Sequence, residues 1–332
     1  MATFKALRVH QAEKATQAKL EQIGIDDLSA GEVVIRVAWS GVNYKDALAV
    51  TGKGRIMKRF PNVAGIDLSG IVESSTSPHY RKGDKVLVTG CNIGEALDGG
   101  FAEMARVPAA AVIALPQGLT LREAMAIGTA GFTAAFALRR MLENHQAPAM
   151  GPIAVTGPTG GVGSIAIDLF KRAGFTVHAI TGKAGASDAY LKSLGADVVV
   201  SRQSIEMGKK PLESATWGGA VDNLGGETLA WLTRTVKPWG NVASIGLAQG
   251  FELNTTVMPF ILRGVSILGI HSVECPRPWR EELWKRLSTD WKPRHFDRLV
   301  AREVTLDDLP KICGEFIAGT VQGRTLVKVA GG

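Results

Sequence analysis

The sequence predicts an α/β protein in which a doubly wound parallel sheet is inserted into a discontinuous, β-rich domain. Three features of the chain lead to this expectation. Short β-rich segments crowd the first 115 residues, strand and helix then alternate strictly over residues 153–245, and the alternation loosens after residue 265. Strict alternation is typical of βαβ units, whose parallel strands are covered by helices on both faces.

The N-terminal strands are expected where short β-branched runs stand between Gly and Pro residues. They cover residues 5–10, 33–39, 85–89, 101–107 and 111–115. Residues 121–143 then form one long helix with an alanine-rich, apolar face. Because these strands lack intervening helices, they indicate an antiparallel or barrel-like module.

The alternating part follows directly. Its expected strands are residues 153–156, 176–180, 197–200, 220–223 and 241–245, and its expected helices are residues 162–173, 186–194 and 227–236. A strand near 265–270, a Trp-rich helix at 279–291 and a final strand at 324–329 complete the chain. We therefore place a first β-rich part in residues 1–125, the parallel domain in 126–265 and the remainder of the β-rich domain in 266–332.

Composition narrows the class of protein. The 38 Lys and Arg residues exceed the 31 Asp and Glu residues by seven, which is compatible with nucleic acid, an anionic membrane or an anionic small molecule. The longest segment without these charged residues, 144–167, contains three prolines and cannot form a spanning helix. The three cysteines form no C-x-x-C pair, and no apolar leader is evident, so we expect a cytoplasmic protein with reduced thiols.

The most informative segment is the glycine cluster after the strand at 153–156. It reads Gly157-Pro-Thr159-Gly160-Gly161-Val162-Gly163, and an apolar-periodic helix begins at once. The glycines allow the backbone to approach a pyrophosphate, and the helix N-terminus offers free N–H groups to it. A Gly-rich turn without a ligand is the alternative. The strand-turn-helix context and the further β/α units favour a dinucleotide site.

The end of the second strand of this unit indicates which dinucleotide is bound. NAD binders place an acidic residue there, whereas this chain reads Thr181-Gly182-Lys183, and Arg202 follows the third strand. Two cations and a hydroxyl can bind the 2′-phosphate of NADPH. The alternative is that Lys183 and Arg202 are solvated surface charges.

No metal site is expected, because three scattered cysteines and six histidines lack the spacing of zinc ligands. At this point several motifs resemble the zinc-free medium-chain dehydrogenase/reductases, with a Rossmann domain inside a GroES-like domain. The motifs are residues 43–46 (NYKD), 65–67 (GID, where zinc members have Gly-His-Glu), 128–134 (GTAGFTA) and 156–163. Four longer strings resemble the acryloyl-CoA reductase subgroup, whose members are also described as quinone oxidoreductases: residues 43–54, 190–196, 256–263 and 322–329.

The resemblance implies NADPH-dependent reduction of acryloyl-CoA to propionyl-CoA and assigns roles to residues of this chain. Tyr44 contacts the nicotinamide end and is the candidate catalytic residue. The remaining cofactor contacts implied are Thr159, Gly160, Gly161, Val162, Thr181, Gly182, Lys183, Arg202, Leu247, Ile261 and Ser272. Relatives carry an Asn where this chain has Thr320 and Val321, and the loop 90–100 keeps Glu95 but lacks the aromatic residues expected there.

Several residues keep two interpretations. Tyr44 either donates a hydrogen bond to the developing enolate or only fixes the cofactor. Asn43 and Asp46 either touch substrate or cap a short helix, and Thr129 and Thr133 either face the cofactor or pack. The tryptophans at 279, 284 and 291 are core residues or an adenine platform.

Two further expectations concern partners. The basic cluster of Lys53, Arg55, Lys58 and Arg59 is either a solvated face or an anchor for the phosphates of coenzyme A. In this family the strand at 265–270 pairs with its copy, which implies a homodimer. An NADPH:quinone or enone reductase and a non-catalytic NADPH-binding protein remain as alternative functions.

Overall fold

The computed structural model describes residues 3–12 and 15–329 of the chain. The chain divides into two compact units, each discontinuous in sequence. The first comprises residues 1–129, 273–289 and 300–332, and the second comprises residues 130–272 and 290–299. The domain bounds expected at residues 125 and 265, and the catalytic and cofactor-binding roles expected of the two domains, remain predictions.

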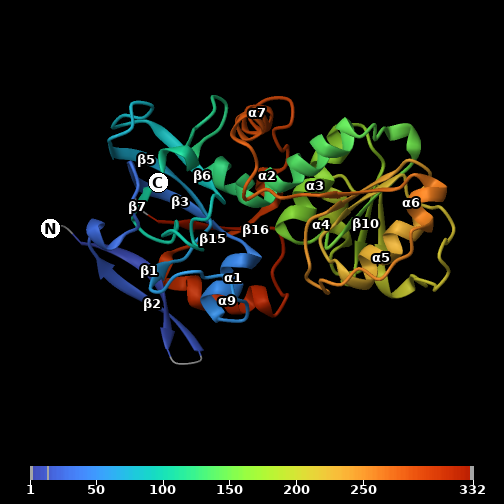
Figure 1. Cartoon of the computed structure of the whole chain (residues 1–332), viewed down its shortest axis with the longest axis horizontal. Coiled ribbons are helices and arrows are strands. Elements are labelled where there is room, and N and C mark those ends of the chain that lie inside the picture. Colours follow the sequence, from blue (N-terminus) through green and yellow to red (C-terminus); the bar gives the residue numbers. More distant parts are fainter. Residues whose placement is uncertain (1–2, 13–14, 330–332) are drawn as a thin grey trace. The chain divides into compact units, whose positions relative to one another are not determined.

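The second unit is built on a six-stranded sheet in the order β11-β10-β9-β12-β13-β14 (Figure 1). Neighbouring strands are parallel throughout. The strands are β9 (Ile153–Thr156), β10 (Val177–Thr181), β11 (Val198–Ser201), β12 (Gly219–Asp222), β13 (Asn241–Ser244) and β14 (Ser266–Gly269). This order is typical of doubly wound, dinucleotide-binding sheets and confirms the expected α/β fold.

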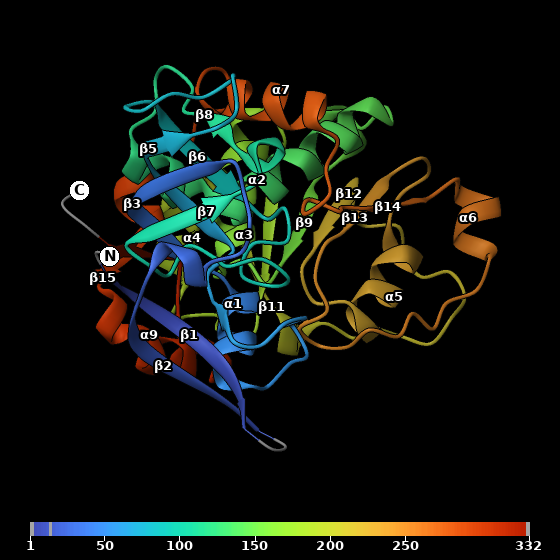
Figure 2. The same cartoon turned by 60° about the vertical axis from the view of Figure 1, so that its left-hand side comes forward.

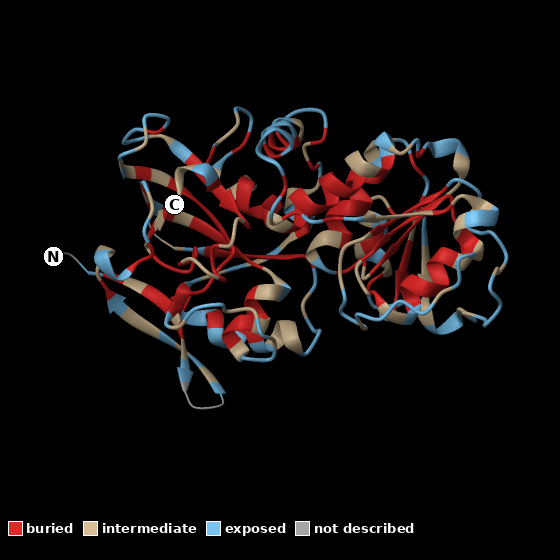
Figure 3. Cartoon of the chain, viewed as in Figure 1, coloured by how far each residue is buried: buried red, intermediate tan, exposed pale blue. Residues whose placement is uncertain are grey.

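Five α-helices lie wholly within the described residues of this unit, and the first four follow β9, β10, β12 and β13. They are α3 (Gly161–Arg172), α4 (Asp188–Ser193), α5 (Gly226–Thr235), α6 (Met258–Arg263) and α8 (Phe296–Leu299). Helices α3 and α4 lie on one face of the sheet and α5 on the other, as right-handed crossovers require (Figure 1); Figure 2 shows α5 and α6 from another side. Every residue of the central strands β9 and β12 is buried, so their side chains form the core between the helical layers (Figure 3).

The first unit contains two sheets. A three-stranded sheet has the order β2-β1-β4, and a larger one has the order β15-β16-β3-β5-β6-β8, with β7 paired to β3. The strands are β1 (Phe4–Ala12), β2 (Ala15–Ile23), β3 (Val33–Val42), β4 (Asn62–Val63), β5 (Asp67–Ser75), β6 (Lys85–Thr89), β7 (Met104–Val107), β8 (Ile113–Ala114), β15 (Val300–Val304) and β16 (Arg324–Lys328). The C-terminal β16 pairs with β3, so strands that lie far apart in the sequence are neighbours in this sheet.

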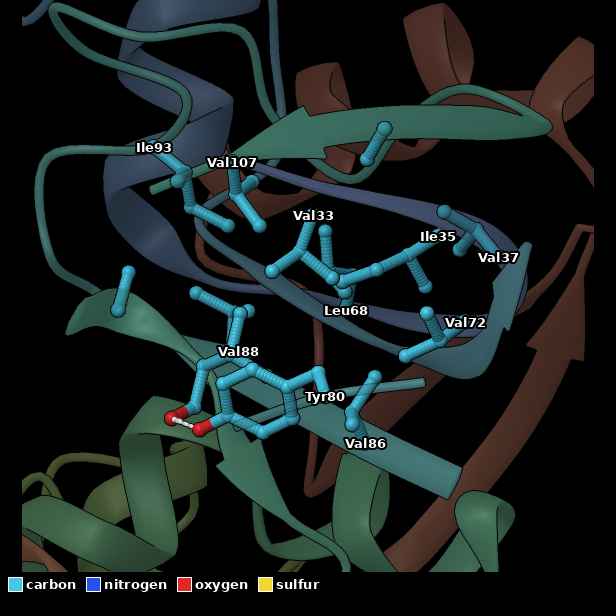
Figure 4. Close-up of a cluster of buried hydrophobic side chains, with 13 residues drawn as sticks. Val33, Ile35, Val37, Leu68, Val72, Tyr80, Val86, Val88, Ile93 and Val107 are labelled. Atoms are coloured by element: carbon cyan, nitrogen blue, oxygen red, sulfur yellow. Dashed lines mark hydrogen bonds between the residues drawn. The ribbon is translucent and has the colours of Figure 1, made fainter. Parts of the chain in front are cut away.

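Alternation along β3 produces one of the cores of this unit. Val33, Ile35 and Val37 point the same way and pack against side chains from β5, β6 and β7 (Figure 4). The hydroxyl of the buried Tyr80 donates to the carbonyl of Val112 at 2.6 Å. That bond satisfies the polar end of an otherwise apolar side chain.

The helices of the first unit are α1 (Tyr44–Thr51), α7 (Arg277–Leu287) and α9 (Leu309–Ile317), and α1 packs against α9. Helix α2 (Leu121–Glu143) contributes to both units and is interrupted at Gly128, which has φ 52° and ψ −161°. Short 3₁₀ turns cover Ile25–Asp27, Ala109–Ala111, Pro148–Met150, Arg202–Ser204 and Leu306–Asp308.

Some expected elements differ in extent. The strand expected at 101–107 begins only at Met104, and the helix expected at 279–291 is α7, which ends at Leu287. The three tryptophans in question differ in burial, since Trp284 and Trp291 are buried and Trp279 is 40% exposed. Core packing is therefore confirmed for Trp284 and Trp291. Among the described residues, no helix is both long and apolar enough to cross a membrane; a cytoplasmic location remains a prediction.

Candidate functional site

The glycine cluster forms a tight turn between β9 and α3, as the sequence predicts. Gly157 has φ 55°, a left-handed conformation that favours glycine. A Cβ atom on Gly163 would lie 2.4 Å from the carbonyl oxygen of Gly157, so only glycine lets the helix pack this closely. Gly160 is the N-cap of α3, and no side chain fills the cap. The turn therefore leaves backbone N–H groups at a 12-residue helix N-terminus for an external anion.

The ends of the neighbouring strands lie level with this turn. Ile180 of β10 pairs with Thr156 of β9, and Thr181 pairs with Ser201 of β11. The carboxyl ends of these parallel strands therefore bring the turn, residues 181–183 and Arg202 to one edge of the sheet, which is where ligands bind in such folds.

The second-strand end carries no acidic side chain at residues 181–183. The buried Thr181 hydroxyl accepts the N–H of Lys183 at 3.0 Å. The Arg202 guanidinium lies 3.3 Å from the Cβ position of Gly182, and Gln203 donates to the Gly182 carbonyl at 3.0 Å. Lys183 and Arg202 thus form a cationic wall beside Gly182, whose lack of a side chain lets the guanidinium approach this closely.

The other expected cofactor contacts of this unit are spread along the sheet. Ser272 follows β14 and is buried, and it accepts a hydrogen bond from Thr133 at 2.8 Å. Leu247 follows β13 and is 63% exposed. Ile261 lies in α6 and is 71% exposed. Its assignment to the cofactor groove stays a prediction.

Tyr44 belongs to the first unit. It is the first residue of α1 and is 46% exposed. The preceding Asn43 is the N-cap, and its N–H donates to the Asp46 carboxylate at 2.8 Å. The helix-capping interpretation of Asn43 and Asp46 is therefore confirmed, and the cap fixes the backbone from which Tyr44 projects.

A buried polar cluster adjoins this cap. Asp67 accepts hydrogen bonds from the Asn43 amide at 2.8 Å, from the Thr129 N–H at 2.9 Å and from the Thr129 hydroxyl at 2.5 Å. Arg324, 2% exposed, lies 3.7 Å from the Asp67 carboxylate and donates to the Asn43 side-chain oxygen at 3.0 Å. The Thr129 hydroxyl is thus used in a hydrogen bond within the protein, to the carboxylate of Asp67.

Burial changes the acid–base properties of this cluster. Loss of solvent raises the pKa of the Asp46 carboxyl to about 7, and the nearby Asp67 charge adds to that rise. Burial also raises the pKa of Asp67, against the opposing effect of Arg324 and the Thr129 and Asn43 hydrogen bonds. On α9, burial and the Asp46 charge raise the pKa of the Cys313 thiol to about 12.

The basic cluster between α1 and β4 is divided by two buried carboxylates. Glu95 in the loop 90–100 pairs with Lys45 at 2.8 Å and Lys58 at 3.7 Å, and Asp98 pairs with Arg59 at 2.9 Å. Both acids are largely buried, so these pairs fasten the basic segment to the loop. Lys53 and Arg55 are exposed and make no such pair in the structure as described.

Within residues 3–12 and 15–329, no three His, Cys, Asp or Glu side chains are grouped in a way that could hold a metal ion. The polar cluster of Asn43, Asp46, Asp67 and Arg324 is held together by hydrogen bonds and an ion pair among its own members.

Comparisons with known proteins agree with this arrangement. Residues 29–117 match the alcohol dehydrogenase GroES-like domain, and residues 161–289 match the zinc-binding dehydrogenase family. The acrylyl-CoA reductase AcuI of Ruegeria pomeroyi is 44% identical over 98% of this chain and 99% of its own length. The chain belongs to the medium-chain dehydrogenase/reductase superfamily. It is an oxidoreductase of that superfamily.

Other members of the superfamily show what similar chains bind. A Bacillus subtilis protein named as a candidate quinone oxidoreductase, YhfP, is 43% identical over 98% of this chain and 99% of its own. Its crystal structure, with NAD bound, has a TM-score of 0.95 and covers 99% of this chain and 100% of that one. The YhdH oxidoreductase of Salmonella enterica, in complex with NADP, is 44% identical with a TM-score of 0.95, covering 98% of this chain and 100% of that one.

Sequence reasoning about this superfamily member found the phosphate turn but missed the Asp67–Arg324 cluster. Its members are 257 residues apart (324 − 67) and no local pattern links them. Both residues stand in strings that support the resemblance, at 65–67 and 322–329. Arg324 stands at the start of the predicted final strand at 324–329. An arginine at the start of a core strand is a signal to search for a buried carboxylate that would pair with it.

The raised pKa of Asp46 leads to a prediction about stability. Because its pKa in the folded protein is about 7, above an unfolded value near 3.8, the folded state binds the proton more tightly, and stability falls as pH rises through 7. In D46N this loss is absent. We take the free energy of unfolding of D46N minus that of wild type. This difference should be roughly 2–3 kcal/mol more positive at pH 8 than at pH 5.

Urea unfolding of both proteins at pH 5, 6, 7 and 8 measures this difference. The variant also loses an acceptor for the Asn43 N–H, which adds a constant penalty that does not vary with pH. A difference that stays flat across this range would contradict the raised pKa.

Proposed function

We propose that the chain reduces the α,β double bond of acryloyl-CoA to propionyl-CoA with NADPH. The observation that carries the cofactor assignment is the cationic wall at residues 181–183 and 202, where the Arg202 guanidinium lies against Gly182 and no carboxylate occupies the strand end. The name of the Ruegeria pomeroyi relative, 44% identical over nearly the whole chain, supports the substrate. The chain is an NADPH-dependent oxidoreductase in this proposal.

The residues at the sheet edge fit a dinucleotide phosphate. The N-terminus of α3 has no side-chain cap, so its N–H groups suit the pyrophosphate. Gly163 lets the first turn of the helix pack closely against the preceding turn at Gly157. Thr181, Lys183 and Arg202 suit the 2′-phosphate, and Leu247 and Ser272 stand after the next strands along the same edge. When bound, NADPH supplies the hydride that the β-carbon of the enoyl thioester receives.

The reaction balances with one added proton. The β-carbon gains the hydride, the π electron pair moves toward the thioester oxygen, and a proton then bonds to the α-carbon, giving propionyl-CoA and NADP⁺. Negative charge develops on the thioester oxygen, so a donor aimed at that oxygen accelerates the step. Tyr44, a half-exposed phenol on a capped helix, is the candidate for this role or for fixing the nicotinamide ribose.

Coenzyme A carries phosphates that need cations of their own. The structure reduces the basic cluster available to them, because Lys58 and Arg59 are held by Glu95 and Asp98. All four cations are exposed, but Lys53 and Arg55 make no ion pair among the described residues, and we assign the CoA phosphates to these two.

The cofactor assignment predicts a selective effect of K183A and R202A. Each charge-assisted bond to a phosphate contributes roughly 1.5–3 kcal/mol, so the double variant should raise the KM for NADPH by about a hundredfold. The KM for NADH, which lacks the 2′-phosphate, should change by less than about threefold. Steady-state kinetics with both cofactors provide the measurement, and equal losses for the two would contradict the assignment.

The substrate assignment is tested by NADPH oxidation with acryloyl-CoA, crotonyl-CoA and a benzoquinone side by side. We expect acryloyl-CoA to have the highest kcat/KM, and K53A/R55A to raise its KM about tenfold with little effect on the quinone. The matched control is R81A/K82A, which removes two exposed cations elsewhere in the same unit and should change neither KM.

The alternatives are outcomes of the same assay. Preference for the benzoquinone would establish a quinone reductase, in line with the name of the Bacillus subtilis relative. Tight NADPH binding without turnover of any acceptor would establish a non-catalytic NADPH-binding protein.

We also propose a homodimer formed through β14, an edge strand of its sheet. The segment that precedes it carries large exposed apolar side chains besides those assigned to the cofactor: Trp239, Phe251, Leu253, Val257 and Leu262. Covering side chains of this kind with a partner surface removes apolar area from water, which is favourable and supports an interface here. A second copy covering this segment would bury Val257, which a single chain leaves 65% exposed.

Light scattering at micromolar concentration should give twice the 35.2 kDa of one chain. V257D should shift the mass toward the monomer because it buries a charge in the interface. V198D is the matched control, since Val198 is 41% exposed on β11 at the opposite edge of the sheet and should leave the dimer intact. A monomeric wild type would contradict the proposal.

A further inference from the structure

The Asp67–Arg324 cluster lies where several elements of the first unit end or begin. Arg324 opens β16, Asp67 opens β5, Asn43 caps α1, and Gly128 interrupts α2. Asp46, Asp67 and Arg324 are each at most 2% exposed. Burying two carboxylates with one guanidinium is costly unless every polar atom finds a partner.

Arg324 satisfies one side of the break in α2. Its Nε donates to the carbonyl of Ala126 at 3.2 Å, and its guanidinium also donates to the carbonyl of Met125 at 3.3 Å. These carbonyls belong to the last turn before Gly128, where the helix no longer supplies N–H partners.

Asp67 satisfies the other side of the break. The helix resumes at Thr129, and its N–H and hydroxyl both donate to the Asp67 carboxylate. The break itself requires glycine, because a Cβ on Gly128 would lie 2.6 Å from both Arg324 and Asp67. The ion pair therefore occupies the break and caps both helix segments.

The same two side chains hold the start of α1. The Asn43 amide donates to Asp67, and the Asn43 side-chain oxygen accepts from Arg324, which also donates to the carbonyl of Val42 at 3.2 Å. Asn43 immediately precedes Tyr44, and Asp46 closes the cap from within the helix. The backbone of Tyr44 and the backbone of Thr129 are thus fixed by one shared pair of charges.

We propose that Asp67 and Arg324 are positioning residues, which set the place of Tyr44 and of the α2 backbone at Thr129, where the helix resumes. This inference rests on the proposed function for the role of Tyr44. It predicts that loss of the pair acts on turnover through Tyr44 and leaves the phosphate end of the cofactor site unchanged.

The test uses D67N and R324K. D67N keeps an oxygen for the Thr129 N–H but removes the charge facing Arg324, and R324K removes the planar fork that reaches several carbonyls. Each should lower kcat at least tenfold while the KM for NADPH changes by less than threefold. D67N combined with Y44F should be no slower than the slower single variant, because both changes act on one group.

The matched control is R280K, which makes the same substitution at another buried arginine of the first unit. Arg280 is 3% exposed and donates to the carbonyls of Thr89 and Val273. We expect R280K to lower the melting temperature about as much as R324K while changing kcat by less than twofold.

Amide hydrogen exchange supplies a readout that needs no substrate. D67N should raise exchange at residues 43–46 and 129–131 more than R280K does. Unchanged exchange there would overturn the inference, and so would raised exchange with an unchanged kcat. Should wild type turn over no acceptor, the proposed function fails by itself, and the local exchange alone decides whether the pair positions Tyr44.

Discussion

The first unit depends on the burial of one guanidinium. Arg324 is almost without solvent, so each of its donors must find an acceptor inside the protein. The acceptors come from the end of β3, the cap of α1 and the broken turn of α2, and the balancing charge comes from Asp67. Removing one partner of such a buried pair costs about 3–5 kcal/mol, because the other charge is left unpaired. The chain must therefore bring its C-terminal strand back to its N-terminal strands before this part of the fold is complete.

The second unit is organised by a different constraint, namely register between parallel strands. Thr156, Ile180, Thr181 and Ser201 lie at matched positions of adjacent strands, so the residues that follow them meet at one edge. No long-range ion pair is needed to assemble this edge. The phosphate turn and the cationic wall can therefore be predicted from local patterns alone, since each follows a recognisable β-branched run.

This contrast explains what the sequence could and could not predict. The βαβ alternation, the turn at 157–163 and the basic strand end at 181–183 are local features, and the structure contains the strands and helices that they predict. Strand β5 was not predicted, because its sequence DLSGIVESS does not alternate and Gly70 is pressed against the carbonyl of Arg36. Helix α9 was not predicted either, because it begins with Leu-Pro and contains a Gly. Its apolar face is stabilised by packing against α1, which the local sequence does not reveal.

The same reasoning applies to charge. A sequence counts four cations between residues 53 and 59, but Glu95 and Asp98, more than 30 positions later, pair with two of them. A buried carboxylate holds its cation more firmly than a solvated phosphate can, since the carboxylate would otherwise be left uncompensated. Lys58 and Arg59, although exposed, are paired with carboxylates of the loop 90–100, whereas Lys53 and Arg55 make no such pair among the described residues and are the better candidates to meet a ligand. A count of the cations at residues 53–59 therefore overstates the attraction of this segment for an anionic ligand, because Glu95 and Asp98 compensate two of the four charges.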